Sequence, residues 1–111
     1  MNSTFLRFLQ LKEVLTGHQV EAEIDLTCQK LLEFLSVRHA QQKPLTVSEV
    51  MQLQQIASPA TLHRKLSVLL EAGYVEFVFE GKNRRTKFVH PTAKSDQYFD
   101  ALGKVLAQSL A

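Results

Sequence analysis

The segment that most constrains the fold of this chain runs from residue 46 to residue 92. Thr46 is followed three positions later by Glu49, and this spacing is typical of a capping box, in which each side chain bonds the backbone N–H of the other residue at a helix start. Residues 54–58, QQIAS, are expected to form the turn that follows. The first part of the segment therefore predicts a short helix that begins at Thr46 and ends in a turn.

A second helix is predicted directly after that turn, over residues 59–72. Ser58 and Pro59 are a strong start signal, because serine caps the backbone N–H groups of a first turn and proline suits the first helical position. Gly73 is expected to end the helix, since glycine adopts the left-handed conformation just past a helix end without steric cost. Two helices joined by a short turn form a helix-turn-helix.

Two β-prone runs follow, over residues 75–79 and 86–90. Their β-branched and aromatic residues, separated by a loop, predict a hairpin. The order helix, turn, helix, hairpin is typical of a winged helix-turn-helix, in which the hairpin is called the wing. We therefore predict a mainly α fold with a small β-hairpin, and we take residues 46–92 as its core.

Three further helices are expected around this core, over residues 4–16, residues 22–40 and from residue 93 to about residue 110. Gly17 is well suited to end the first of them. The second has an apolar face of five residues: Ile24, Leu31, Leu32, Leu35 and Val37. All these elements are assigned to a single domain of residues 1–111, because no linker or low-complexity segment divides the chain.

The two terminal segments, residues 1–17 and 93–111, are predicted to form a dimer interface. The helix over residues 4–16 is apolar on more than one side, and a chain of this size covers only one side. We therefore expect a second copy of the chain to cover the rest. The residues assigned to this interface are Phe5, Phe8, Leu9, Leu11, Leu102, Val105 and Leu106.

The helix over residues 59–72 divides into an apolar side and a polar side. At about 100° per residue, one arc of the helix carries only leucines, and this arc is expected to face the core. These leucines are Leu62, Leu66, Leu69 and Leu70. The other side combines small, hydroxyl and cationic residues at the start of the helix, where a recognition helix contacts base edges in the major groove. The expected contact residues are Ser58, Ala60, Thr61, His63, Arg64, Lys65 and Ser67.

The predicted wing carries a run of cations with no acidic residue among them. Like charges at a hairpin tip repel each other, whereas a polyanion would be attracted to them and would release its counterions on binding. The wing residues assigned to DNA are Lys82, Asn83, Arg84, Arg85 and Lys87. The alternative is that both basic surfaces are solvated faces of ordinary elements. A helix with a basic, small-residue side followed by a hairpin with a basic tip favours a single DNA-binding surface formed by both elements.

The composition indicates which other classes of protein can be set aside. The net charge of +2 is only mildly basic, so that the argument for nucleic acid depends on where the cations cluster. Cys28 is the one cysteine and is expected to be buried and inert, with a redox-sensing thiol as the alternative. The four histidines lack metal-ligand spacing, and no catalytic motif is present. We expect no enzyme activity, no metal and no cofactor.

The apolar runs of the chain are short. None approaches the roughly 18 apolar residues that a membrane-spanning helix needs, and the N-terminal run lacks the features of a signal peptide. We expect a cytoplasmic protein with no membrane partner.

The run from Ser58 to Thr92 resembles the DNA-binding core of the MarR-type (multiple antibiotic resistance regulator) winged-helix family. The likeness lies in the helix start with Thr61 and Arg64, in the motif LLEAGYV and in the basic wing, and it extends over about residues 26–110. In that family an acidic residue often stands where this chain has Asn83. The resemblance implies a homodimer clasped through its terminal helices, and it implies that Arg85 contacts the minor groove.

These observations predict a sequence-specific regulator of transcription that binds double-stranded DNA, acting as a homodimeric repressor. Two alternatives remain open at this point. One is a winged-helix module that docks a protein partner, and the other is a phage or plasmid DNA-binding factor outside gene regulation. The sequence leaves open whether a small-molecule effector binds.

Overall fold

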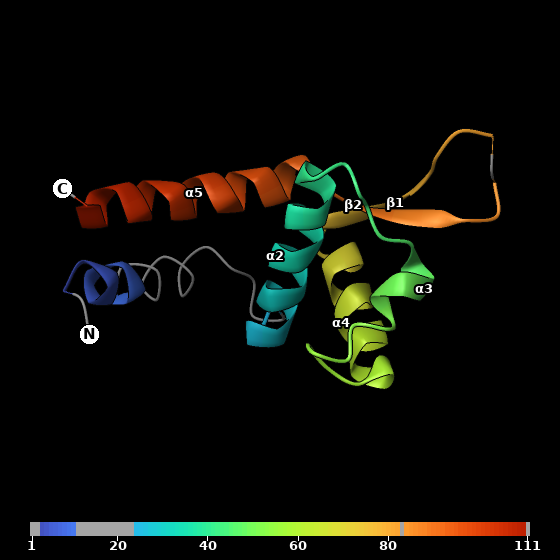
Figure 1. Ribbon diagram of the computed structural model, residues 1–111, viewed down its shortest axis with the longest axis horizontal. Helices are drawn as coiled ribbons and strands as arrows, with labels where there is room; N and C mark the ends of the chain where they lie inside the picture. Colours follow the sequence, from blue (N-terminus) through green and yellow to red (C-terminus); the bar gives the residue numbers. More distant parts are fainter. Residues whose placement is uncertain (1–2, 11–23, 83, 111) are drawn as a thin grey trace. The chain divides into compact units, whose positions relative to one another are not determined.

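The computed structural model describes residues 3–10, 24–82 and 84–110 of the chain (Figure 1). The fold is mainly helical and has one small antiparallel hairpin. The chain divides into two compact units, which we name the core unit (residues 22–95) and the terminal unit (residues 1–21 and 96–111). The boundary between the units falls inside the last helix.

The first helix of the core unit, α2, spans Leu26–Ala40 and begins later than the expected residue 22. Asp25 is its N-cap, and the Asp25 side chain accepts a hydrogen bond from the backbone N–H of Cys28. Ile24 is buried although it precedes the helix. Val37, assigned to the apolar face, is 56% exposed, because the buried side of α2 is formed by Cys28, Leu31, Leu32 and Leu35.

Helix α3 spans Val47–Val50 and has the predicted capping box at its start. Thr46 Oγ1 accepts from the backbone N–H of Glu49 at 3.1 Å, and Glu49 Oε1 accepts from the backbone N–H of Thr46 at 2.9 Å. Val50 is buried against the core. The helix is a single turn, since the chain then enters the turns that lead to α4.

Helix α4 spans Pro59–Glu71 and has the predicted signals at both ends. Ser58 is its N-cap, with Pro59 in the first turn. Gly73 has a φ angle of 85°, and the backbone N–H of Tyr74 donates to Leu69 O at 2.9 Å. Together with the hydrogen bond from the backbone N–H of Gly73 to Leu70 O at 3.1 Å, this hydrogen bond forms a Schellman motif at the end of α4.

The hairpin consists of β1, Val75–Phe79, and β2, Lys87–Pro91, paired antiparallel with Phe77 opposite Val89. The second strand begins one residue later than predicted. A short additional pairing extends the hairpin: Thr46 forms a bridge with Phe88, and Val89 N donates to Leu45 O at 2.8 Å. The segment just before α3 is thereby fixed to β2.

The start of α5 (Ala93–Leu110) is bonded to the end of α4. Three successive carbonyl groups there, those of Ala72, Gly73 and Tyr74, accept side-chain hydrogen bonds from the segment after β2. The donors are Lys94 Nζ at 2.6 Å, Thr92 Oγ1 at 2.6 Å and Ser95 Oγ, respectively. Of these groups, the Ala72 carbonyl at the C-cap of α4 is one that the end of a helix leaves without an intrahelical partner.

In the terminal unit, the structure describes a helix over residues 3–10 and the part of α5 from residue 96 to residue 110. Of the residues assigned to a dimer interface, Val105 is buried and Phe8 and Leu102 are half-buried. Phe5, Leu9 and Leu106 are exposed. Leu11 and the expected helix end at Gly17 lie outside the described residues. None of the described helices is both long enough and apolar enough to cross a membrane.

Candidate nucleic-acid interface

Helix α4 presents two chemically different sides. Leu62, Leu66 and Leu69 are buried, as the leucine arc predicts. Leu70 is 39% exposed, because it stands at the edge of that arc in the last turn. The buried leucines fix the rotation of α4, and so the side with Ala60, Thr61 and Arg64 is turned away from the core.

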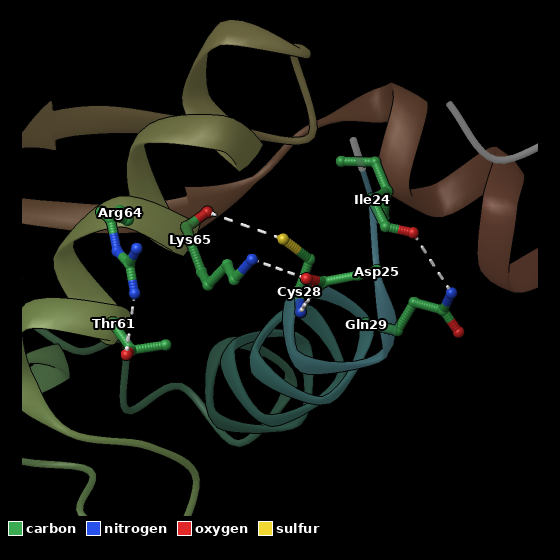
Figure 2. A network of polar contacts seen from close by, with 7 residues as sticks. All are labelled: Ile24, Asp25, Cys28, Gln29, Thr61, Arg64 and Lys65. Carbon is green, nitrogen blue, oxygen red and sulfur yellow. Dashed lines mark hydrogen bonds and ion pairs between the residues drawn. The ribbon is translucent and has the colours of Figure 1, made fainter. Parts of the chain in front are cut away.

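The first turns of α4 carry a row of hydrogen-bonded polar side chains. Ser58 Oγ donates to Thr61 Oγ1 at 3.1 Å and accepts from the backbone N–H of Thr61 at 3.3 Å. Arg64 Nη2 donates to Thr61 Oγ1 at 3.2 Å, one turn further along the helix (Figure 2). Ser58 and Arg64 are exposed, whereas Thr61 between them is half-buried. The row therefore holds the Arg64 guanidinium group over the first turn of the helix.

Three other residues expected to contact DNA lie on α4 as well. Ala60 and His63 are exposed. Ser67 is half-buried, and its hydroxyl group donates to His63 O at 3.0 Å. This bond inside the helix uses the proton of the Ser67 hydroxyl group, which leaves only the oxygen lone pairs for another partner.

Lys65 is directed toward α2 instead of outward. Its Nζ atom lies 2.5 Å from Oδ2 of Asp25, the N-cap of α2, and the Lys65 side chain is only 25% exposed (Figure 2). The Lys65 carbonyl accepts a long bond of 4.0 Å from Cys28 Sγ. The Lys65 ammonium group thus has a carboxylate partner within the protein.

Two side chains in this cluster have shifted acidities. The hydrogen bond from Lys65 lowers the pKa of Asp25, and the hydrogen bond from the Cys28 backbone lowers it further. Burial raises the pKa of the Cys28 thiol, and the nearby Asp25 charge acts in the same direction. Cys28 is fully buried, as the sequence predicts, and a raised thiol pKa disfavours the reactive thiolate. Asp25 was not among the predicted site residues, because a capping position gives no sign of a partner 40 residues away.

The cations of the hairpin are all exposed. We name Lys82, Arg84, Arg85 and Lys87 the loop cluster. Two of its members lie over aromatic rings of β1: Arg84 Cζ is 6.0 Å from the Phe79 ring centroid, and Lys87 Nζ is 6.0 Å from that of Phe77. Asn83 lies outside the described residues. The loop cluster therefore combines four positive charges with aromatic surface.

A groove of about 470 Å³ lies at the base of the hairpin and is lined by residues 46–48, Phe77 and residues 85–87. We name it the hairpin-base groove. It brings Arg85 and Lys87 together with the hydroxyl-bearing residues at the start of α3. The sequence predicts Thr46 only as a cap and predicts no role for Ser48, since nothing local in the sequence indicates that β2 runs beside them.

The elements that carry these groups lie along one side of the core unit. In Figure 1 the hairpin loop, α3 and the first turn of α4 follow one another along the side of this unit remote from α2. The exposed row on α4 and the loop cluster thus belong to one compact unit.

Another pair of titratable groups, His90 and Glu80, lies on the hairpin. His90 Nε2 lies 2.8 Å from Glu80 Oε1, and its ring contacts that of His39 edge-on with centroids 4.8 Å apart. Within the described parts of the chain, no three His, Cys, Asp or Glu residues are grouped so as to hold a metal ion.

Comparison of the chain with protein-family models, with curated proteins and with solved structures finds no match. Function is therefore inferred below from the residues of this chain.

Proposed function

We propose that this protein is a sequence-specific regulator that binds double-stranded DNA through a winged helix-turn-helix, with α4 in the major groove and the hairpin as its wing. The observation that carries the proposal is the hydrogen-bonded row of Ser58, Thr61 and Arg64 on the exposed start of α4. A recognition helix reads bases chiefly through its first turns, and these residues occupy those turns.

The row has the chemistry that base recognition requires. An arginine can donate two hydrogen bonds to O6 and N7 of guanine, and this pair discriminates against other bases. Because Arg64 is already held by the Thr61 hydroxyl, less side-chain entropy is lost when the guanidinium group meets a base. The small side chain of Ala60 lets the helix backbone approach the floor of the groove.

The loop cluster supplies affinity without sequence information. Four exposed cations on one hairpin gain nothing from each other, whereas each phosphate that they contact releases counterions from the DNA. A wing beside a recognition helix is also the arrangement that the MarR-type resemblance implies, and we retain membership of that family as part of the proposal.

The proposed regulator is a homodimeric repressor that acts in the cytoplasm without a cofactor. Support for the dimer comes from the terminal unit, in which Phe5, Leu9 and Leu106 expose large apolar side chains. A dimer would bind a pseudo-palindrome with its half-sites about one helical turn apart. The proposal leaves open whether a small-molecule effector acts on it.

The test is to select preferred duplexes from a random pool and to measure their affinity over a range of salt concentrations. The expected result is a palindromic site, bound with a steep dependence on salt. An asymmetric site contacted by one copy of the chain would contradict the dimeric repressor and would favour a phage or plasmid DNA-binding factor.

A second candidate function is a module that docks another protein. The observation in its favour is the exposure of apolar residues outside the DNA-facing surface, with Leu110 71% exposed and Leu26 62% exposed. Such a module should bind random duplex weakly and with little dependence on salt, because few phosphates would be contacted. The salt titration therefore separates the two candidates.

A further inference from the structure

The proposed recognition surface of α4 does not include the hairpin-base groove. One wall is formed by residues 46–48 at the start of α3, and the other by residues 85–87 at the start of β2. The bridge from Thr46 to Phe88 and the bond from Val89 N to Leu45 O at 2.8 Å join the two walls by backbone pairing. Backbone pairing thus fixes the two walls of the groove relative to each other.

The side chains that line the groove are suited to an anion. Both of its charged residues, Arg85 and Lys87, are cations, and both are exposed. Hydroxyl groups lie on the opposite wall, at Thr46 and Ser48. The acidic residue beside them, Glu49, bonds the backbone N–H of Thr46 through Oε1 and so serves the cap of α3.

The groove also has apolar surface and room beyond a single ion. The ring of Phe77 lines it, and Lys87 Nζ is 6.0 Å from the centroid of that ring. A volume of about 470 Å³ is within the usual range of small-ligand sites. A phosphate group that enters with the sugar attached to it would use both the cations and the ring.

We propose that the hairpin-base groove binds a phosphate group, and that under the proposed function this is a backbone phosphate of duplex DNA. The guanidinium group of Arg85 donates to two phosphate oxygens, a geometry that arginine favours. Lys87 adds a second charge, and the Ser48 hydroxyl group donates from the facing wall. This site rests on the proposed function, and it assigns Arg85 to the sugar–phosphate backbone instead of the minor groove.

The test uses duplexes in which one phosphate at a time is replaced by a neutral methylphosphonate. Wild-type protein should lose affinity at the phosphate that occupies the groove. Arg85→Gln should bind unmodified duplex about tenfold more weakly, as expected when a hydrogen bond to a charged group is lost. Both Arg85→Gln and Ser48→Ala should lose less affinity than wild type on methylphosphonate substitution at that same position, and Arg85→Gln should show the larger reduction. Lys30→Gln, which removes an exposed lysine of α2, is the control that should keep full sensitivity.

The proposal is overturned if either groove variant stays as sensitive as wild type at every position, or if the two variants lose sensitivity at different phosphates. A second arm titrates inorganic phosphate and follows the amide signals of residues 46–48 and 85–87. Should the protein bind no duplex while phosphate shifts these signals in wild type but not in Arg85→Gln, the DNA regulator fails and the groove belongs to a free phosphate. If neither ligand binds, both proposals fail.

Discussion

The Nζ atom of Lys65 lies 2.5 Å from Oδ2 of Asp25, so that a charge from the middle of α4 is held at the first turn of α2. The other carboxylate oxygen of Asp25 accepts from the backbone N–H of Cys28 at 2.9 Å. One carboxylate therefore caps α2 and bonds α4 at the same time. The orientation of α4 depends on this polar contact as well as on its buried leucines.

Replacement of Asp25 by alanine should lower the free energy of unfolding by about 1 kcal/mol, because loss of an N-cap costs roughly that much. Asp25→Asn retains a capping oxygen and loses only the ion pair, so that its cost should be within about 0.5 kcal/mol and close to that of Lys65→Gln. Urea unfolding of the three variants measures these values. An asparagine variant as unstable as the alanine variant would show that the cap is not what Asp25 provides.

Acid should remove the contribution of the Asp25 charge. The pKa of Asp25 is held below its ordinary value of 3.8 by the hydrogen bond from Lys65, so the folded state favours the ionised form. The resulting stability is fully present above the pKa of the unfolded chain and is lost as the pH falls through the lower folded pKa. The difference in unfolding free energy between wild type and Asp25→Asn should therefore shrink below about pH 4. A difference that stays constant from neutral pH to strong acid would contradict this assignment.

Two glycine substitutions should act in opposite directions. Gly73 has a φ angle of 85°, and Gly73→Ala should destabilise the protein by about 1 kcal/mol, because a side chain is strained in that conformation. Gly103 lies inside α5, and a Cβ atom added there meets nothing within 4 Å. Gly103→Ala should therefore raise the stability by about 0.5 to 1 kcal/mol. Thermal unfolding of both variants measures these changes in stability. Two changes of the same sign would contradict the prediction.

Truncation of Arg64 should cost about 1 to 3 kcal/mol in binding to the preferred duplex and should relax the choice of base at one position. The matched control is Arg38→Ala, which removes an arginine of α2 that lies over the Phe34 ring. Selection from a random pool with each variant gives both affinity and base preference. A variant at Arg64 with unchanged preference would remove α4 from base recognition.

Introduction of a charge on the terminal unit should dissociate the proposed dimer. Leu106 is 45% exposed, and a glutamate there would have to be desolvated in an apolar interface. Sedimentation should find Leu106→Glu monomeric. Leu26→Glu, which changes an exposed leucine of the core unit, should remain dimeric. A monomeric wild type would contradict the dimer directly.

The features that the sequence predicted well are those fixed by neighbouring residues. The capping box of Thr46 and Glu49, the start at Ser58 and the close at Gly73 each need only a few residues, and all three are present. The hairpin was predicted for the same reason. Its second strand is displaced by one residue, because β-propensity does not fix a register.

The features that the sequence did not predict depend on distant contacts. Helical periodicity assigned Val37 and Leu70 to buried sides, but it does not say how far the neighbouring elements extend, and both are exposed. Lys65 was expected to face DNA, whereas its partner Asp25 stands 40 positions away. The hairpin-base groove exists because Leu45 and Thr46 pair with β2, and a two-residue pairing leaves no periodic pattern.

Three hydrogen bonds join the segment after β2 to the segment between α4 and β1. The donors are Thr92, Lys94 and Ser95, and the acceptors are the three carbonyl groups that follow α4. None of these bonds involves residues 81–84. The tip is thus exchangeable: a neutral turn grafted in place of residues 81–84 would remove the charge of Lys82 and Arg84 and leave Arg85 and the helices as they are. Substitutions at this tip can therefore change the affinity for a polyanion without changing which bases α4 contacts.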